Sequence, residues 1–221
     1  MRFHFPAARR AGPTLALALV LSLGVTPARA DACHDEIAAL FDGGPLDPFA
    51  LPPHRFTHVV TGQDGSPRYA MTVTFESPVR MMTEMDTGMR SLVIGSESWM
   101  AQGKAAGWTK VPNVLPDDMA ALHARNRDQM RANLTATECL GLVQVDGQPL
   151  TAYRYATQTD PDPAGIYYGA TYTTYLDPDS GMKMRQEVDR EISHYQPQPG
   201  TDHTVQVFTY DDSIAVMPPG E

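Results

Sequence analysis

Histidine is the most versatile catalytic and metal-binding side chain in this sequence, but its spacing matches no known site. No histidine stands in H-E-x-x-H, H-x-H or a similar local pair of metal ligands. His58 lies within an alternating segment, and His54 precedes it by four residues across an expected loop–strand junction. We interpret all the histidines after residue 30 as surface or strand-edge residues: His34, His54, His58, His123, His194 and His203.

Serine and aspartate residues also fall outside catalytic patterns. No serine stands in G-x-S-x-G, and no glycine-rich stretch carries the Lys-Ser/Thr of a phosphate-binding loop. Acids gather in DPDP at 160–163 and DPDSG at 177–181, whose spacing differs from that of an EF-hand calcium loop. Turn formation accounts better for these acids. We therefore expect no catalytic residues, no bound metal and no cofactor.

The two cysteines, Cys33 and Cys139, favour a structural disulfide. An even pair in an exported protein is typical of such a bond. A redox or metal pair is the alternative, but there is no C-x-x-C, and two isolated cysteines are too few for a zinc site. The expected bond would join a short N-terminal helix to a strand about a hundred residues later.

The first 30 residues have the three parts of a secretory signal peptide. A basic start precedes an apolar run at 14–25, and Ala28-Arg29-Ala30 places small residues at positions −3 and −1. The run is shorter than the roughly 20 residues of a membrane-spanning helix. Acylation at Cys33 is the less favoured alternative, because Asp31 fits a lipoprotein signal badly. We expect a periplasmic protein without stable membrane insertion.

Removal of residues 1–30 leaves one acidic domain. The removed segment holds four arginines and no acid, so the net charge changes from −9 to −13. Such a chain is a poor candidate for nucleic-acid binding. We divide the remainder into an N-terminal helix with a proline-rich linker at 31–54, a β domain at 55–212 and a tail at 213–221.

Large, soft side chains occupy positions that we expect to face inward. Met71 and Met85 are examples, and methionine suits irregular apolar spaces. Tyr153, Tyr155 and Tyr172 belong to two tyrosine-rich segments. One interpretation is a loose core with strand-paired aromatic residues; the other is a cavity for apolar ligands. The candidate lining residues for that cavity are Met71, Met85, Trp99, Tyr153, Tyr155 and Tyr172.

Period-two alternation from residue 55 onward predicts a mainly β fold. Turn signals such as Asp64-Gly65 and Asp146-Gly147 separate about ten strands, which indicates an antiparallel meander. A short helix is expected at 35–41 and a longer one at 116–134, with Pro116 at its first position. A long antiparallel sheet with one covered face is curved, so we expect an unclosed barrel around the mid-chain helix. The expected strands after the first are 69–75, 81–86, 89–94, 98–102, a short one at Trp108, 140–145, 150–157, 166–176, 182–192 and 204–210.

Several of these segments, in this order, resemble the periplasmic lipoprotein-carrier superfamily (LolA/LolB-like). FESPVR at 75–80 is followed by the strand at 81–86, LVIGSESW at 92–99 and GWTKVP at 107–112. TTYLDPDSGM at 173–182, followed by Arg185 and Glu187, resembles the final hairpins of that family. Two features depart from the carriers: Ser77 stands where they have a basic residue, and the expected disulfide is not part of their pattern.

The resemblance implies an unclosed antiparallel barrel around a helix, with an apolar cavity and neither catalysis nor a cofactor. It implies a periplasmic binding or carrier protein for an amphiphile such as a lipid, an acyl chain or a lipoprotein. The alternative is an envelope sensor or protein-interaction module on the same scaffold.

Overall fold

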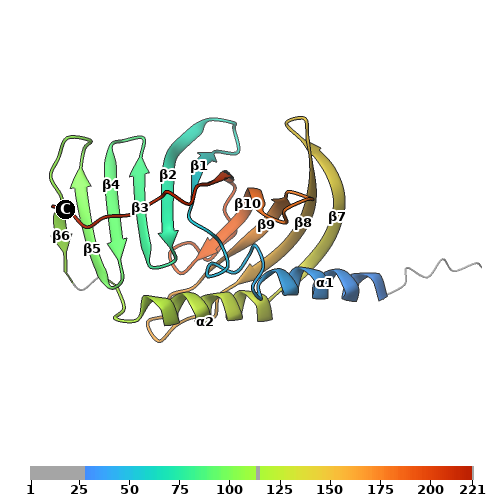
Figure 1. Ribbon diagram of the computed structural model, residues 1–221. Coiled ribbons are helices and arrows are strands. Elements are labelled where there is room, and N and C mark those ends of the chain that lie inside the picture. The colour runs from blue at the N-terminus through green and yellow to red at the C-terminus, as the bar shows by residue number, and fades with distance from the viewer. Residues whose placement is uncertain (1–27, 113–114, 221) are drawn as a thin grey trace, which may run out of the picture.

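The computed structural model describes residues 28–112 and 115–220, which form two helices and one sheet (Figure 1). Neighbouring strands follow the order β6-β5-β4-β3-β2-β1-β11-β10-β9-β8-β7. The elements are α1 (Ala28–Leu40), β1 (His54–Thr61), β2 (Pro67–Ser77), β3 (Arg80–Met85), β4 (Met89–Ile94), β5 (Glu97–Gln102), β6 (Thr109–Val111), α2 (Met119–Ala132), β7 (Thr135–Val145), β8 (Gln148–Gln158), β9 (Tyr168–Leu176), β10 (Lys183–Ser193) and β11 (His203–Tyr210).

The expected fold class is confirmed. The sheet has eleven strands and is antiparallel throughout, and it is not closed, since β6 and β7 form its two edges. Strands β1 to β6 are one meander and β7 to β11 are another. The first and last strands join the two meanders at the centre of the sheet, where Phe56 lies opposite Phe208.

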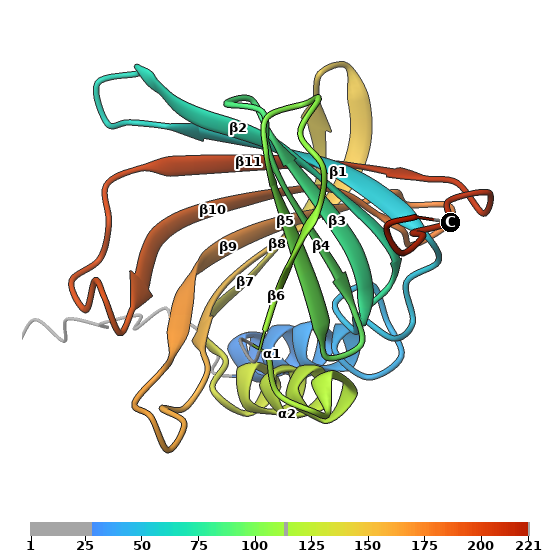
Figure 2. The same ribbon diagram turned by 90° about the vertical axis from the view of Figure 1, so that its left-hand side faces the viewer.

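The sheet curls into an arch, and both helices lie along its open side (Figure 2). Helix α1 packs against β7, and α2 packs against β8. We call the face of the sheet that α1 covers the inner face. Strand alternation and the cross-strand pairs place Tyr155 of β8 and Phe56 of β1 on this same face.

Helix α1 fills one half of the arch, and this differs from the expectation that the mid-chain helix does so. Ile37 of α1 and Phe41, directly after it, are almost fully buried, in one cluster with Tyr153 and Tyr155. In α2 only Met119 is buried. Arginine and other polar residues occupy most of the other positions of this helix. The apolar face therefore belongs mainly to α1, and the disulfide holds that helix against β7.

Most predicted boundaries shift by one or two residues: the short strand expected at Trp108, for example, is β6 at Thr109–Val111 and leaves out Trp108. Three boundaries differ by more. Helix α1 begins at Ala28 instead of residue 35. The expected start of the mature chain, residue 31, therefore lies within this helix. Residues 1–27 of the predicted signal peptide lie outside the described residues. Helix α2 begins at Met119, because the Asp118 carboxylate accepts the Ala121 N–H at 2.8 Å and caps it. Strand β7 begins at Thr135, where register shifts hide its alternation.

The outer face of the sheet is partly covered by the C-terminal segment. Val216 is buried there, and its backbone N–H donates to the Glu76 carboxylate at 2.7 Å. Arg80 donates to the Val216 carbonyl at 2.5 Å. These bonds fix residues of the expected tail on the side of the sheet away from the helices.

Two histidines of β1, His54 and His58, are buried on the inner face, with 7% and 8% of their surface exposed. This contradicts the expectation that they are surface or edge residues, because β1 lies at the centre of the sheet. Burial lowers the pKa of both imidazoles from the ordinary value of 6.5. Folding therefore favours their neutral forms.

The disulfide predicts a strong dependence of stability on reductant. Cys33 and Cys139 are bonded across a separation of 106 residues, which confirms the expected pair. Its loss should lower the free energy of unfolding by about 4–5 kcal/mol in the chain-entropy model. Urea denaturation with and without dithiothreitol measures the difference. The Cys33→Ser/Cys139→Ser variant is the control, since reductant should leave its midpoint unchanged; equal midpoints for oxidised and reduced wild type would contradict the prediction.

The buried histidines predict that acid destabilises the fold. The unfolded chain binds protons at a higher pH than the folded chain, so stability is complete above about pH 6.5 and falls as the pH drops below it. Urea denaturation between about pH 7.5 and pH 5.5 tests this. His58→Gln should lose less stability over that range than wild type, whereas His34→Gln, at a more exposed histidine, should behave like wild type. An equal loss in all three proteins would refute the assignment.

Candidate ligand-binding site

A cavity of about 160 Å³ lies on the inner face, at one end of the strands in the middle of the sheet. Its walls come from the linker after α1 and from β1, β2, β10 and β11. We call it the central pocket, and it is lined by Pro48, Leu51, Pro52, His54, Phe56, Phe75, Ser77, Pro78, Lys183, Gln206 and Phe208. The pocket therefore lies where the N-terminal and C-terminal meanders meet.

Aromatic rings form much of the pocket wall. His54 lies opposite Phe75 in the strand register, and their rings stack with centroids 5.1 Å apart. Phe56 lies opposite Phe208, at 5.0 Å. Cross-strand pairs of this kind are rigid and present large apolar surfaces. The His54 Nδ1–H donates to the Pro52 carbonyl at 2.9 Å, which ties the ring to the linker.

The linker wall is held in place by a buried ion pair. The Asp47 carboxylate accepts from Arg127 of α2 at 3.0 Å and from the Gly43 and Phe49 N–H groups at 3.2 and 2.9 Å. Only 5% of the Asp47 surface is exposed, so the pair is partly shielded from water and salt. Helix α2 thus positions Pro48 and Pro52 over the pocket.

One charged residue, Lys183, enters the central pocket. Regular alternation would place Lys183 on the same face as Arg185, but the register of β10 with β9 shifts between them. Lys183 consequently pairs with Leu176 of the inner face, whereas Arg185 pairs with Tyr175 of the outer face. The Lys183 ammonium lies 4.5 Å from the centre of the Phe208 ring, in a cation–π contact.

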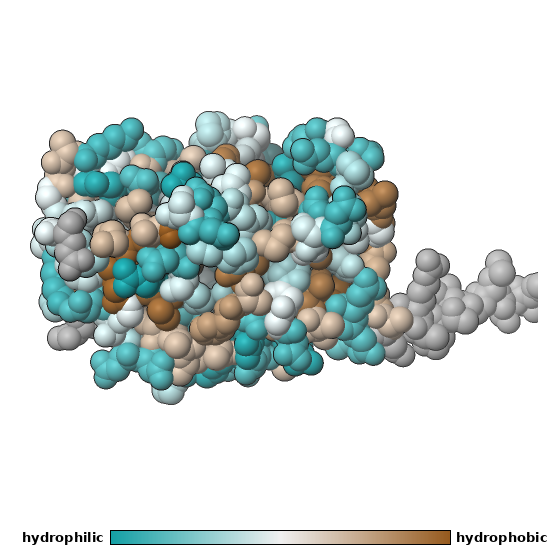
Figure 3. All heavy atoms as spheres, viewed as in Figure 1, coloured by the Kyte–Doolittle hydropathy of each residue, from teal (hydrophilic) through white to brown (hydrophobic). Residues whose placement is uncertain are grey.

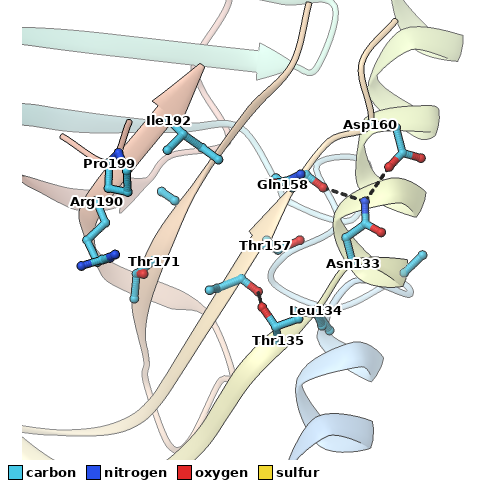
Figure 4. A pocket seen from close by; sticks show the side chains of 13 residues that line it. Asn133, Leu134, Thr135, Thr157, Gln158, Asp160, Thr171, Arg190, Ile192 and Pro199 are labelled. Carbon is cyan, nitrogen blue, oxygen red and sulfur yellow. Dashed lines mark hydrogen bonds between the residues drawn. The ribbon is translucent and has the colours of Figure 1, made fainter. Parts of the chain in front are cut away.

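A larger hollow of about 560 Å³ lies where the end of α2 meets β7 to β10 (Figure 4). Several of its polar side chains are bonded within the protein. Asn133 donates to the Gln158 carbonyl at 3.0 Å and to Asp160 at 2.9 Å, and Thr135 donates to the Ala156 carbonyl. These bonds anchor the end of α2 to β8, so we assign the hollow a structural role.

The three predicted tyrosines lie together beneath α1. Tyr155 is 1% exposed, meets Phe41 edge to face at 6.0 Å and stacks on Tyr172 at 5.5 Å. Tyr153 donates to the Glu36 carboxylate at 2.6 Å. Burial, followed by that bond, raises the pKa of Tyr153 to about 12. The tyrosines pack against a helix of the same chain.

The remaining predicted residues are divided between the two faces of the sheet. Met71 and Met85 lie opposite each other on the inner face of β2 and β3, and both are half-buried. Trp99 lies on the outer face, where Lys110 packs over its ring. None of the six predicted ligand residues lines the central pocket.

Sequence reasoning missed the residues that do line the central pocket. His54 and Phe56 alternate with Arg55 and Thr57, so their shared face was visible in the sequence. Their pairing with β11, however, joins positions more than 140 residues apart. No local pattern reports such a contact.

The space-filling view shows scattered apolar surface on this side of the molecule. Hydrophobic residues appear in several separate places among hydrophilic ones (Figure 3). No described helix is long and apolar enough to cross a bilayer. The central pocket gathers apolar and aromatic side chains in one concave place, as ligand sites usually do.

Comparisons with known proteins give structural matches. No family model matches the sequence, and no curated protein matches it. The lipoprotein LppX of Mycobacterium tuberculosis is similar over 85% of this chain and 99% of its own, with 14% identity and a TM-score of 0.52. The MucA/MucB complex of Pseudomonas aeruginosa aligns over 82% of this chain and 59% of the matched chain, with 15% identity and a TM-score of 0.41.

A LolA superfamily protein from Nitrosomonas europaea aligns over 77% of this chain and 90% of its own, with 9% identity and a TM-score of 0.32. At these identities the comparisons concern the fold. The match to LppX covers nearly the whole of that protein and includes the large unclosed sheet described above. The chain therefore has the fold of LppX, with the large unclosed sheet that its sequence predicted.

Proposed function

We propose that this protein is a periplasmic, non-enzymatic binding or carrier protein for an amphiphile with an acyl chain. The observation that carries the proposal is the central pocket. It is apolar on most sides, has stacked aromatic walls and is covered by a linker that Asp47 and Arg127 hold in place. A lipid or a lipoprotein acyl chain fits such a surface, because burial of each methylene contributes about 0.8 kcal/mol.

The size of the pocket limits how the ligand binds. A volume of about 160 Å³ is below the roughly 300–1,000 Å³ of drug-sized sites. We therefore place one end of the ligand in the pocket and let the remainder follow the inner face toward Met71 and Met85. From Phe75 to Met71 along β2 is about 13 Å, which adds room for a longer chain.

The chemistry of the pocket supports binding without catalysis. Among the described residues that line it, Ser77 is the one with a hydroxyl group, and none carries a carboxylate. The Nδ1–H of His54 is already bonded to the Pro52 carbonyl. A nucleophile with an oriented base would need a different arrangement.

Two features support export as a soluble protein. The predicted signal peptide at 1–30 addresses the chain to an oxidising compartment, where a disulfide such as Cys33–Cys139 persists. Because the Cys33 sulfur is bonded to Cys139, it is not available for acylation. We therefore propose a periplasmic carrier that is not anchored to a membrane by a lipid.

A substitution that fills the pocket tests the proposal. Ser77→Trp should weaken the binding of dodecanol at least about tenfold, because the indole would displace at least about two methylenes of the ligand, each worth about 0.8 kcal/mol. Isothermal titration calorimetry measures the dissociation constant. Thr57→Trp, at an exposed position on the outer face, is the matched control and should bind like wild type. Equal binding by both variants, or no binding by wild type, would refute the proposal.

A second candidate function is a protein-interaction module, which the β7 edge favours. Leu140 and Leu142 of this edge strand are 44% and 64% exposed, and an open edge is a template for a partner strand. For this function we expect a photoreactive residue at position 142 to trap one specific protein in cells, and the same residue at position 57 to trap none. A protein that binds dodecanol and gives no product at position 142 would exclude this alternative.

A further inference from the structure

Among the described residues that line the central pocket, Lys183 is the only charged one. Its ammonium lies over the Phe208 ring, and its charge acts on the imidazole of His54 in the same wall. The residue reaches this position because the register shift in β10 turns it away from Arg185 and toward the inner face. A local irregularity of the strand thus places a cation in an apolar cavity.

The ammonium of Lys183 has no acidic partner in the part of the chain that the structure describes. No carboxylate there lies within 4.0 Å of it, and none lines the pocket. Its neighbour Arg185, on the opposite face, shows the usual arrangement, with Glu187 at 2.9 Å and Asp146 at 3.5 Å. Buried cations are normally paired in this way.

Desolvation lowers the pKa of Lys183 to about 8, so the side chain still carries its charge at neutral pH. The contact with the Phe208 ring compensates only part of the lost hydration. Two titratable side chains lie close to this residue: the imidazole of His54, whose pKa is lowered mainly by burial and also by the charge of Lys183, and the phenol of Tyr210, which donates to the Lys183 carbonyl at 2.7 Å. An anion supplied from outside the protein would complete the site.

We infer that the central pocket recognises a long-chain carboxylate, whose head group receives hydrogen bonds from Lys183 Nζ and whose chain lies against Phe56 and Phe75. This inference rests on the proposed function, to which it adds the chemistry of the head group. A carboxylate fits better than a phosphate. A single lysine, in a cavity of about 160 Å³, suits a small group with a single charge, whereas phosphates are usually held by arginine forks or several backbone N–H groups.

Three probes of equal chain length test the inference by calorimetry: dodecanoate, dodecanol and dodecylammonium. Wild type should bind dodecanoate at least about tenfold more tightly than dodecanol, as expected for a hydrogen bond between charged groups, and should bind dodecylammonium least. Lys183→Met should abolish the preference, so that dodecanoate no longer binds more tightly than dodecanol. Lys183→Arg should retain the preference, and Lys104→Met, at an exposed lysine, is the matched control.

The outcomes separate the inference from the proposed function. Equal binding of dodecanoate and dodecanol to wild type would overturn the role of Lys183 and leave amphiphile binding intact. A preference for dodecanoate that survives in Lys183→Met would also overturn it. Failure of wild type to bind any of the three probes would overturn both.

Discussion

Between β6 and β7 the chain must pass from one edge of the sheet to the other. Laid flat, eleven strands would span roughly 48 Å. The 14 residues of α2 supply about 21 Å, and residues 112–118 and 133–134 add about 30 Å at full extension. A flat sheet would thus require a nearly straight connection. Curling brings the edges together and relaxes this demand, and it creates the concave inner face on which the central pocket depends.

The arch is divided into a filled half and a central cavity. Over β7 to β9 the space is taken by Ile37 of α1 and by Phe41, which follows it directly; the disulfide fastens α1 to the sheet edge. Helix α1 ends at Leu40, and the proline-rich linker that follows cannot continue it. The chain there covers β1, β2 and β11 with short prolyl and leucyl side chains, so room remains beneath it. The central pocket therefore lies beyond the C-terminal end of α1, where the helix no longer covers the sheet.

Local patterns predicted most of the elements but not the site. Alternation and turn signals located the strands, and Asp146 and Gly147 indeed have the positive φ angles of a tight hairpin. The pairing of β1 with β11 depends on the closure of the whole chain, which no short window contains. The inward turn of Lys183 depends on one extra residue in β10, and a single shift of register exchanges the faces. Trp99 was predicted to face inward, because the sequence does not show how its strand pairs with the neighbouring strands.

The central claim is that an acyl chain occupies the central pocket, and photoaffinity mapping with a diazirine-bearing fatty acid tests it most directly. After irradiation and digestion, mass spectrometry should find the label on the segments that line the pocket, at 48–56, 75–78 and 206–208. Label confined to the outer face around Trp99 and Trp108, or no label at all, would contradict the account.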